Sequence, residues 1–185
     1  MGIIGVVAAL TLPNLNSSTG EKEKVAKVKK IYSNLQDAFG RAEAVYGPYN
    51  EWFVNDTKRS DEVQRLGERI AEFMKISKIC GTDGTAGCVT SGKTNFIGSG
   101  GLQLSMDLST LSNTYSYITT DGTTILFYIN NSDIANIYVD IDGPNKGSFT
   151  MGKDLFSFTI DDEDEGIQTM GSSSGVLYQD SVLIG

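Results

Sequence analysis

The sequence predicts an α+β fold, in which an N-terminal α-helix packs on a C-terminal antiparallel β-sheet. Apolar residues recur at helical spacing between positions 25 and 46, and the second half of the chain consists of short β-prone runs separated by turn residues. Twenty-one glycines against three prolines also fit many turns between short strands. Helices followed by strands are typical of α+β domains.

Length and composition narrow the classes of protein. A chain of 185 residues suits one domain with a real core, and its 39% hydrophobic content is that of a folded protein. The net charge of −8 argues against a nucleic-acid partner. Histidine is absent, which removes the commonest general base and the commonest neutral metal ligand. We therefore expect a protein that is not an enzyme.

Residues Gly2 to Leu12 form an uncharged apolar run that Pro13 follows. The run is too short to span a bilayer, which takes about 20 residues, and it lacks the basic start of a signal peptide. A helix that is apolar on all sides belongs in lipid or inside an assembly. We predict that residues 1–20 are the remnant of a membrane or filament-core helix. Its site residues are Ile3, Ile4, Val6, Val7, Leu10, Leu12 and Pro13.

A polar break over Asn14–Gly20 separates this run from an amphipathic helix, and residues 21–185 are predicted to form the globular head. Gly47 and Pro48 end the helix, because glycine suits the left-handed cap and proline cannot continue it. The apolar stripe consists of Val25, Val28, Tyr32, Leu35, Phe39, Ala42 and Tyr46. Most of the lysines are expected on the opposite, solvated side; they are Lys22, Lys24, Lys27, Lys29 and Lys30.

The middle of the chain predicts a second helix, capped by Ser60 or Asp61 and fraying toward Ile79. Its buried face consists of Val63, Leu66, Ile70 and Phe73. Glycine and serine then dominate Thr94–Gly101, which we interpret as a connection without regular structure.

Four strands follow. Tyr115–Thr119 and Thr124–Ile129 flank an Asp-Gly pair at 121–122, the strongest short-range signal of a hairpin. Ile137–Ile141 and Leu155–Ile160 are the third and fourth strands.

Two segments carry a resemblance to a known family. Residues 2–15 (GIIGVVAALTLPNL) resemble the inner part of the N-terminal methylation segment of type IV pilins and type II secretion pseudopilins. The family's basic leader, processing site and glutamate are absent, so we expect Met1 to mark a truncated chain. Residues 138–146 (YVDIDGPNK) and 152–158 (GKDLFSF) are similar to pseudopilin head domains. The resemblance implies a pilin-like fold and a structural role, with no catalytic residues.

The two cysteines, Cys80 and Cys88, lie in a short glycine-rich loop. A disulfide between them would contribute about 2–3 kcal/mol and would persist in an oxidising compartment, the periplasm or cell exterior. Two free thiols in a flexible loop are the alternative. Spacing and the envelope location that the resemblance implies favour the disulfide.

Oxygen ligands gather around a Gly-Pro turn in the second half, at Asp140, Asp142, Asn145 and Asp154. Oxygen-only clusters suit calcium, which some pseudopilins hold in head loops. Residues 140–143 (DIDG) match the beginning of an EF-hand loop, but the later ligands and the closing glutamate of that motif are missing. A plain turn, in which Asp142 and Asn145 bond local backbone amides, is favoured over the metal site. We therefore expect no cofactor, with calcium as the one alternative.

Other motifs are weaker. Acidic runs such as Asp161–Glu165 usually form solvated loops; the alternative is a site for a cation or a basic partner. Residues 98–101 (GSGG) lack the strand–helix context of a phosphate-binding loop.

Two functions follow as expectations. In the first, the chain is a pilin or pseudopilin that sits in the bacterial inner membrane before assembly and then in a periplasmic or extracellular filament. Its partners would be other such subunits. In the second, it is a secreted or periplasmic binding module with a damaged signal sequence.

Overall fold

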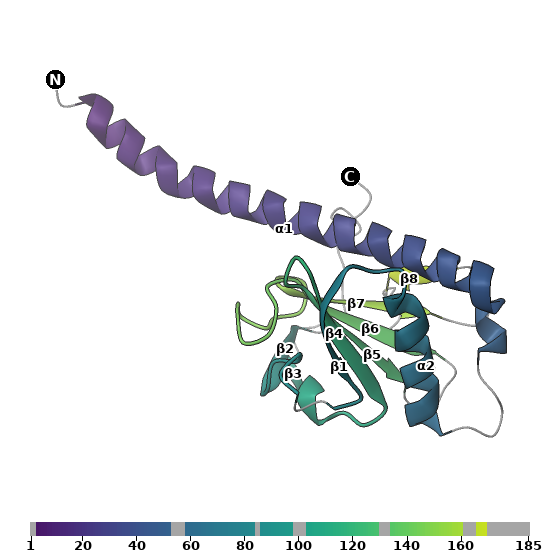
Figure 1. Ribbon diagram of the computed structural model, residues 1–185. Helices are drawn as coiled ribbons and strands as arrows, with labels where there is room; N and C mark the ends of the chain where they lie inside the picture. Colours follow the sequence, from purple (N-terminus) through teal and green to yellow (C-terminus); the bar gives the residue numbers. More distant parts are fainter. Residues whose placement is uncertain are drawn as a thin grey trace.

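The computed structural model describes residues 3–52, 58–83, 86–97, 103–129, 134–160 and 166–169; at 3–19, 93, 95–97, 103–105 and 169 it describes the backbone alone. Within these ranges the helices are α1 (Ile3–Tyr46) and α2 (Arg59–Ala71), with 3₁₀ turns at Tyr49–Glu51 and Leu108–Thr110. The strands are β1 (Ile76–Gly81), β2 (Lys93–Ile97), β3 (Gln103–Asp107), β4 (Thr114–Thr119), β5 (Thr124–Ile129), β6 (Ala135–Asp140), β7 (Leu155–Ile160) and β8 (Ile167–Thr169). The α+β prediction is confirmed: a long N-terminal helix precedes an antiparallel sheet (Figure 1).

Six strands form one sheet in the order β1-β4-β5-β6-β7-β8, and every neighbouring pair is antiparallel. The Asp-Gly hairpin is confirmed as the β4–β5 connection. The third and fourth predicted strands are β6 and β7, and the bounds of β7 are those expected. β2 and β3 pair separately as a two-stranded ribbon.

The main core lies between the two helices and one face of the sheet. Alternate residues of the strands point into it, as the two-residue period of a strand requires. The predicted stripe on α1 supplies its other side: Val28, Leu35, Phe39 and Ala42 are buried, and Tyr32 packs against the same cluster. A second, smaller cluster covers part of the opposite sheet face.

α1 is one continuous helix, so the predicted break over 14–20 is wrong. A proline inside a helix removes one backbone hydrogen bond and bends the helix without necessarily ending it. The serines and asparagines that follow have only modest helix penalties, well below that of proline. The first part of α1 extends beyond the sheet, and the last part lies along it (Figure 1).

Both helix ends test the cap predictions. α1 ends at Tyr46, and Gly47 follows with φ +84° and donates to the Glu43 carbonyl, as predicted. The prediction for α2 is wrong, because its N-cap is Lys58, without a side-chain bond, and both Ser60 and Asp61 lie inside the helix.

Two segments differ from their predictions and are strands. The second helix was expected to fray toward Ile79, but α2 ends at Ala71 and Ile79 belongs to β1, which pairs with the distant β4. Thr94, expected to begin a connection without regular structure, belongs to β2, which pairs with β3, the next strand along the chain. The predicted buried face of α2 is confirmed for Val63, Leu66 and Ile70, whereas Phe73 is partly buried beyond the helix end.

Candidate functional site

The loop between β6 and β7 carries the predicted oxygen ligands; we call residues 140–154 the acidic turn. Asp140 ends β6 and Asp154 precedes β7, and the register of the two strands brings these residues to the same end of the sheet. The Ile141 amide donates to the Asp154 carbonyl at 2.9 Å, which closes the turn.

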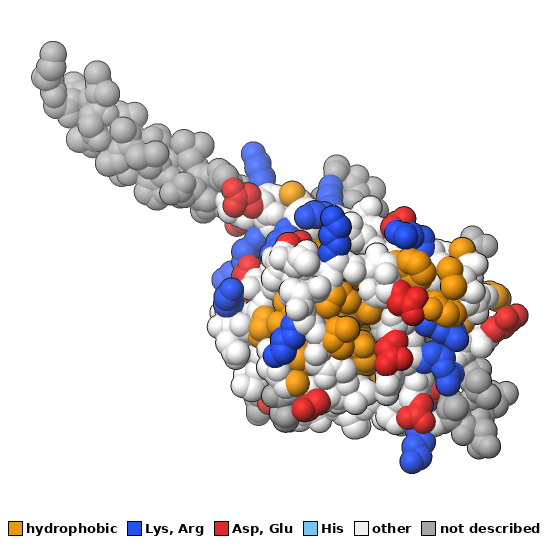
Figure 2. Space-filling model, in the orientation of Figure 1, with side chains coloured by type: hydrophobic (Ala, Val, Ile, Leu, Met, Phe, Trp, Pro, Cys, Tyr) orange, Lys and Arg blue, Asp and Glu red, His pale blue; other side chains and the backbone are white. Residues whose placement is uncertain are grey.

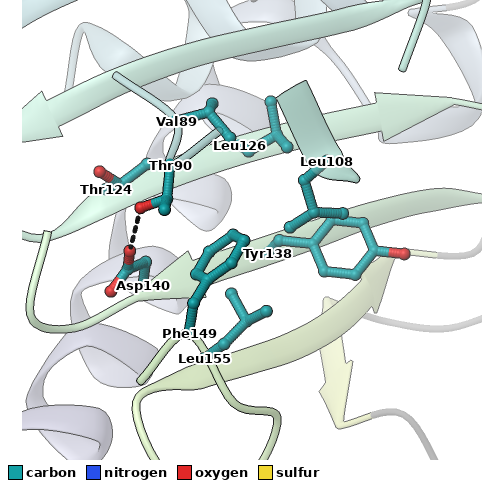
Figure 3. Close-up of a pocket in the computed structure, with 9 residues that line it drawn as sticks. All are labelled: Val89, Thr90, Leu108, Thr124, Leu126, Tyr138, Asp140, Phe149 and Leu155. Atoms are coloured by element: carbon teal, nitrogen blue, oxygen red, sulfur yellow. Dashed lines mark hydrogen bonds between the residues drawn. The ribbon is translucent and has the colours of Figure 1, made fainter. Parts of the chain in front are cut away.

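Asp140 is buried at the base of the acidic turn. Its Oδ1 accepts hydrogen bonds from the amides of Asp142 and Gly143, both at 3.2 Å, and its Oδ2 accepts one from the Thr90 hydroxyl at 3.4 Å (Figure 3). Burial raises the pKa of Asp140 to about 6, although the two amides act in the opposite direction. The neighbouring carboxylates of Asp154 and Asp142 raise this pKa further, because they repel its charge.

Asp154 is also buried but differs in its partners. Its carboxylate accepts from the amide and hydroxyl of Ser148 and from the amide of Thr150. Burial alone would raise the pKa of Asp154, yet these bonds and the nearby Lys24 ammonium hold it below its ordinary value. Asp154 is therefore an ionised anchor for the turn backbone.

The other two predicted ligands have different contacts. Asp142 forms an ion pair with Lys24 of α1 at 3.2 Å. Asn145 has a left-handed backbone with φ +59°, and its amide donates to the Thr90 hydroxyl at 2.9 Å.

The described residues contain no group of three or more histidine, cysteine, aspartate or glutamate side chains that could hold a metal ion. The alternative of a plain turn accounts for the contacts of Asp140 and Asp154, although it was expected to involve Asp142 and Asn145. The calcium site stays a prediction, which titration of the protein with calcium would test.

Lysines of α1 connect the helix to this end of the sheet. Lys24 pairs with Asp142, and the Lys27 ammonium donates to the Ile141 carbonyl. Lys24 and Lys27 are therefore exceptions among the lysines, which were expected mostly on the solvated side. At 100° per residue, positions 24 and 27 lie on the same side of the helix as the buried Val28 and Ile31.

The predicted disulfide between Cys80 and Cys88 is present. It joins β1 to a loop on the face of the sheet opposite the helices, where Cys88 is buried and its carbonyl accepts from the Thr124 hydroxyl at 2.7 Å. Thr90 follows in the same loop and bonds Asp140 and the Asn145 amide. The disulfide therefore anchors the loop that covers the acidic turn.

A small hollow of about 10 Å³, room for about one water molecule, lies beneath this loop (Figure 3). It is far smaller than a typical ligand pocket. Apolar side chains surround it, with Asp140 and two threonines as the polar groups. Its lining consists of Val89, Thr90, Leu108, Thr124, Leu126, Tyr138, Asp140, Phe149 and Leu155.

The predicted filament residues, from Ile3 to Pro13, lie in the part of α1 that extends beyond the sheet, and their side chains are outside the described residues. Among the described residues, no helix combines the length and the apolar character needed to cross a membrane. The acidic run Asp161–Glu165 and the residues 98–101 also lie outside the described residues.

The sequence analysis did not single out Gln36 or Thr90, whose side chains join distant parts of the head. Gln36 of α1 pairs with a peptide of β8: its side-chain amide donates to the Ile167 carbonyl at 2.6 Å and accepts from the Ile167 amide at 3.1 Å. The Tyr32 hydroxyl donates to the same carbonyl at 2.9 Å. A polar residue beside an apolar stripe was the available signal for Gln36. No sequence signal indicated Thr90, because its hydrogen-bond partners lie 50 residues or more away along the chain.

Comparisons of the chain with models of protein families, with curated proteins and with solved structures give no match.

Proposed function

We propose that the chain is a structural subunit, a pilin or pseudopilin, of a type IV pilus or a type II secretion-like filament in the bacterial envelope. The single observation that carries the proposal is the division of α1. Its last part packs on the sheet of the head, and its first part, which includes the apolar run, extends beyond it (Figure 1).

The length of α1 supports this role. At 1.5 Å per residue its 44 residues span about 66 Å, more than the head needs. The run Gly2–Leu12 within the extending part is apolar on all sides in sequence, and such a helix is stable in hydrocarbon or among other helices. Neighbouring copies would supply those helices in a filament core, with the heads outside. Before assembly, the inner membrane would surround the same residues.

The disulfide supports an extracytoplasmic place for the head. Such bonds persist in oxidising compartments and are rare in the cytosol. The proposal gives the chain no catalytic residue and no nucleic-acid partner, in line with its net charge of −8.

The test is assembly of the full chain after detergent removal, followed by sedimentation and electron microscopy. Val7→Asp places a charge in the apolar run. Val45→Asp is the matched control, because Val45 is 62% exposed on the head part of the same helix. The proposal predicts ordered assemblies for the parent and for Val45→Asp, and loss of assembly for Val7→Asp. A parent chain that stays monomeric without detergent or lipid would instead favour a secreted binding module.

A further inference from the structure

The arginines of the chain differ in how their charge is balanced. Arg59 pairs with Glu62 at 2.8 Å, and Arg41 also has an acidic partner, four residues before it on α1. Arg65 and Arg69 of α2 form no ion pair with any of the described residues. In a chain with a net charge of −8, two arginines without a carboxylate partner are unexpected.

Arg65 and Arg69 are also close to each other. They lie four residues apart on α2, and therefore on the same side of the helix, where like charges destabilise it. Both side chains are partly buried. Burial lowers the pKa of Arg69 below its ordinary value, and the charge of Arg65 lowers it further. An anion bound beside the pair would counter this repulsion, because an opposite charge stabilises the charged form.

Aromatic rings hold the Arg69 side chain in place. Its guanidinium carbon lies 4.6 Å from the ring centre of Tyr46 and 5.1 Å from that of Trp52. These are cation–π contacts, which attract the charge without using its N–H groups. Among the described residues, the buried Nη1 of Arg69 has no hydrogen-bond partner. A planar guanidinium that is already fixed in orientation loses less entropy when it binds an anion.

The acidic group beside Arg69 is already engaged. Both carboxylate oxygens of Glu72 accept a hydrogen bond from the Tyr46 hydroxyl, at 2.7 and 2.6 Å. Glu72 raises the pKa of Arg69, but by less than burial and Arg65 lower it. Arg65 donates to the Trp52 carbonyl at 2.8 Å, which is a neutral acceptor. The described residues therefore supply the pair with no anion of its own.

The surroundings of the pair are typical of a contact with protein. Arginine, tyrosine and tryptophan are the residues that most often dominate binding at protein interfaces. Figure 2 shows apolar, acidic and basic side chains next to one another over the part of the head where Figure 1 places α2. This composition favours an acidic side chain of a protein over a free small anion.

We propose that Arg65 and Arg69 together bind the carboxylate of an acidic side chain on a second copy of the chain. The guanidinium fork matches a carboxylate with two parallel hydrogen bonds, and such charge-assisted bonds are about twice as strong as neutral ones. A second copy fits as the source, because it brings 23 acidic residues against 15 basic ones. Copies that each carry a net charge of −8 repel one another, and this contact offsets part of the repulsion. The inference rests on the proposed function, since it names a contact between neighbouring subunits.

The first test measures how fast phenylglyoxal, a reagent specific for arginine, modifies each arginine of the full chain, with mass spectrometry as the readout. Assembly is expected to slow the modification of Arg65 and Arg69 about tenfold, relative to the chain dispersed in detergent. Arg59 is the internal control, because Glu62 is its partner in both states and its rate should not change.

Three results would count against the contact. Equal rates for the arginine pair in assembled and dispersed chains would refute this contact alone, whereas a parent chain that forms no assembly would also refute the proposed function. Succinate, a free dicarboxylate, is added to the dispersed chain in a parallel sample. If succinate slows the modification as much as assembly does, the assignment to a second copy is overturned.

The second test uses variants. Arg69→Gln is expected to raise the protein concentration needed for assembly about tenfold. Arg41→Gln is the matched control, because it removes the same charge and a similar ring contact, with Phe73 at 4.9 Å, but Arg41 pairs with Asp37. This control should assemble like the parent, and equal effects of the two variants would overturn the inference. Trp52 emission checks that each variant is folded; should Arg69→Gln not fold, the modification rates of the parent decide.

Discussion

The acidic turn contacts the β4–β5 turn, and this contact predicts the effect of replacing Gly143. This glycine lies in the acidic turn with φ +82°, and a Cβ built on it would lie 2.3 Å from the carbonyl oxygen of Gly122 in the β4–β5 turn. The obstacle is backbone, so it cannot rotate away as a side chain would. Gly143→Ala must therefore push the two turns apart.

The expected cost has two parts. A left-handed backbone costs a residue other than glycine about 1–2 kcal/mol. The overlap adds about 1–3 kcal/mol, as overpacking does elsewhere. The total for Gly143→Ala is about 2–5 kcal/mol. Gly122→Ala is the matched control, because its φ is +83° but nothing lies within 4 Å of a Cβ there, so it incurs the first part alone.

Urea unfolding followed by fluorescence of Trp52 measures both changes. Trp52 is the chain's one tryptophan and is 1% exposed, so its emission reports loss of the core. Gly143→Ala is expected to unfold at a clearly lower urea concentration than Gly122→Ala. Equal midpoints for the two variants would refute the contact between the turns.

Three further predictions concern the head. Gln36→Ala leaves the buried amide of Ile167 without its helix partner, while Tyr32 still donates to the carbonyl, and should lower the free energy of unfolding by about 1–3 kcal/mol, measured by urea; a change below a few tenths would contradict the bond pair. The folded pKa of Asp140, about 6, exceeds the ordinary value of 3.8 for an aspartate, so the folded state binds more protons between these values. Its contribution to stability is present below pH 3.8 and is lost as pH rises through 6, by about 3 kcal/mol in all; Asp140→Asn should remove this loss, and parallel pH profiles for variant and parent would contradict it. Reducing the Cys80–Cys88 bond should cost about 2–3 kcal/mol and release the amides of the loop for exchange; a parent whose unfolding midpoint is insensitive to reductant would contradict that role.

The elements that the sequence predicted well have local signals. The stripe on α1, the Asp-Gly hairpin and the strand at 155–160 each follow from residues within one short window. The disulfide was favoured by the close spacing of its cysteines, eight residues apart, together with the envelope location that the resemblance implies.

Most features that the sequence did not predict depend on distant partners. β1 is not apparent until its partner β4 is known, because sheet stabilisation comes from cross-strand neighbours. β2 pairs with the next strand, β3, but it begins a stretch in which glycine and serine dominate the sequence. The bonds of Lys24 and Lys27 were not predicted, because a helical pattern does not show that an aspartate and a carbonyl lie at the near end of the sheet. Only the fold shows that Thr90 lies beside Asp140.

The central claim is that the apolar run of α1 lies in a hydrocarbon-like environment. The chain's two cysteines are bonded to each other, so Val7→Cys would provide a single free thiol for a nitroxide label. In lipid vesicles or assembled material, electron paramagnetic resonance should show a label at position 7 open to oxygen and shielded from a water-soluble relaxation agent. A label at the exposed position 45 should show the reverse. Equal access of the water-soluble agent to both labels would contradict the claim.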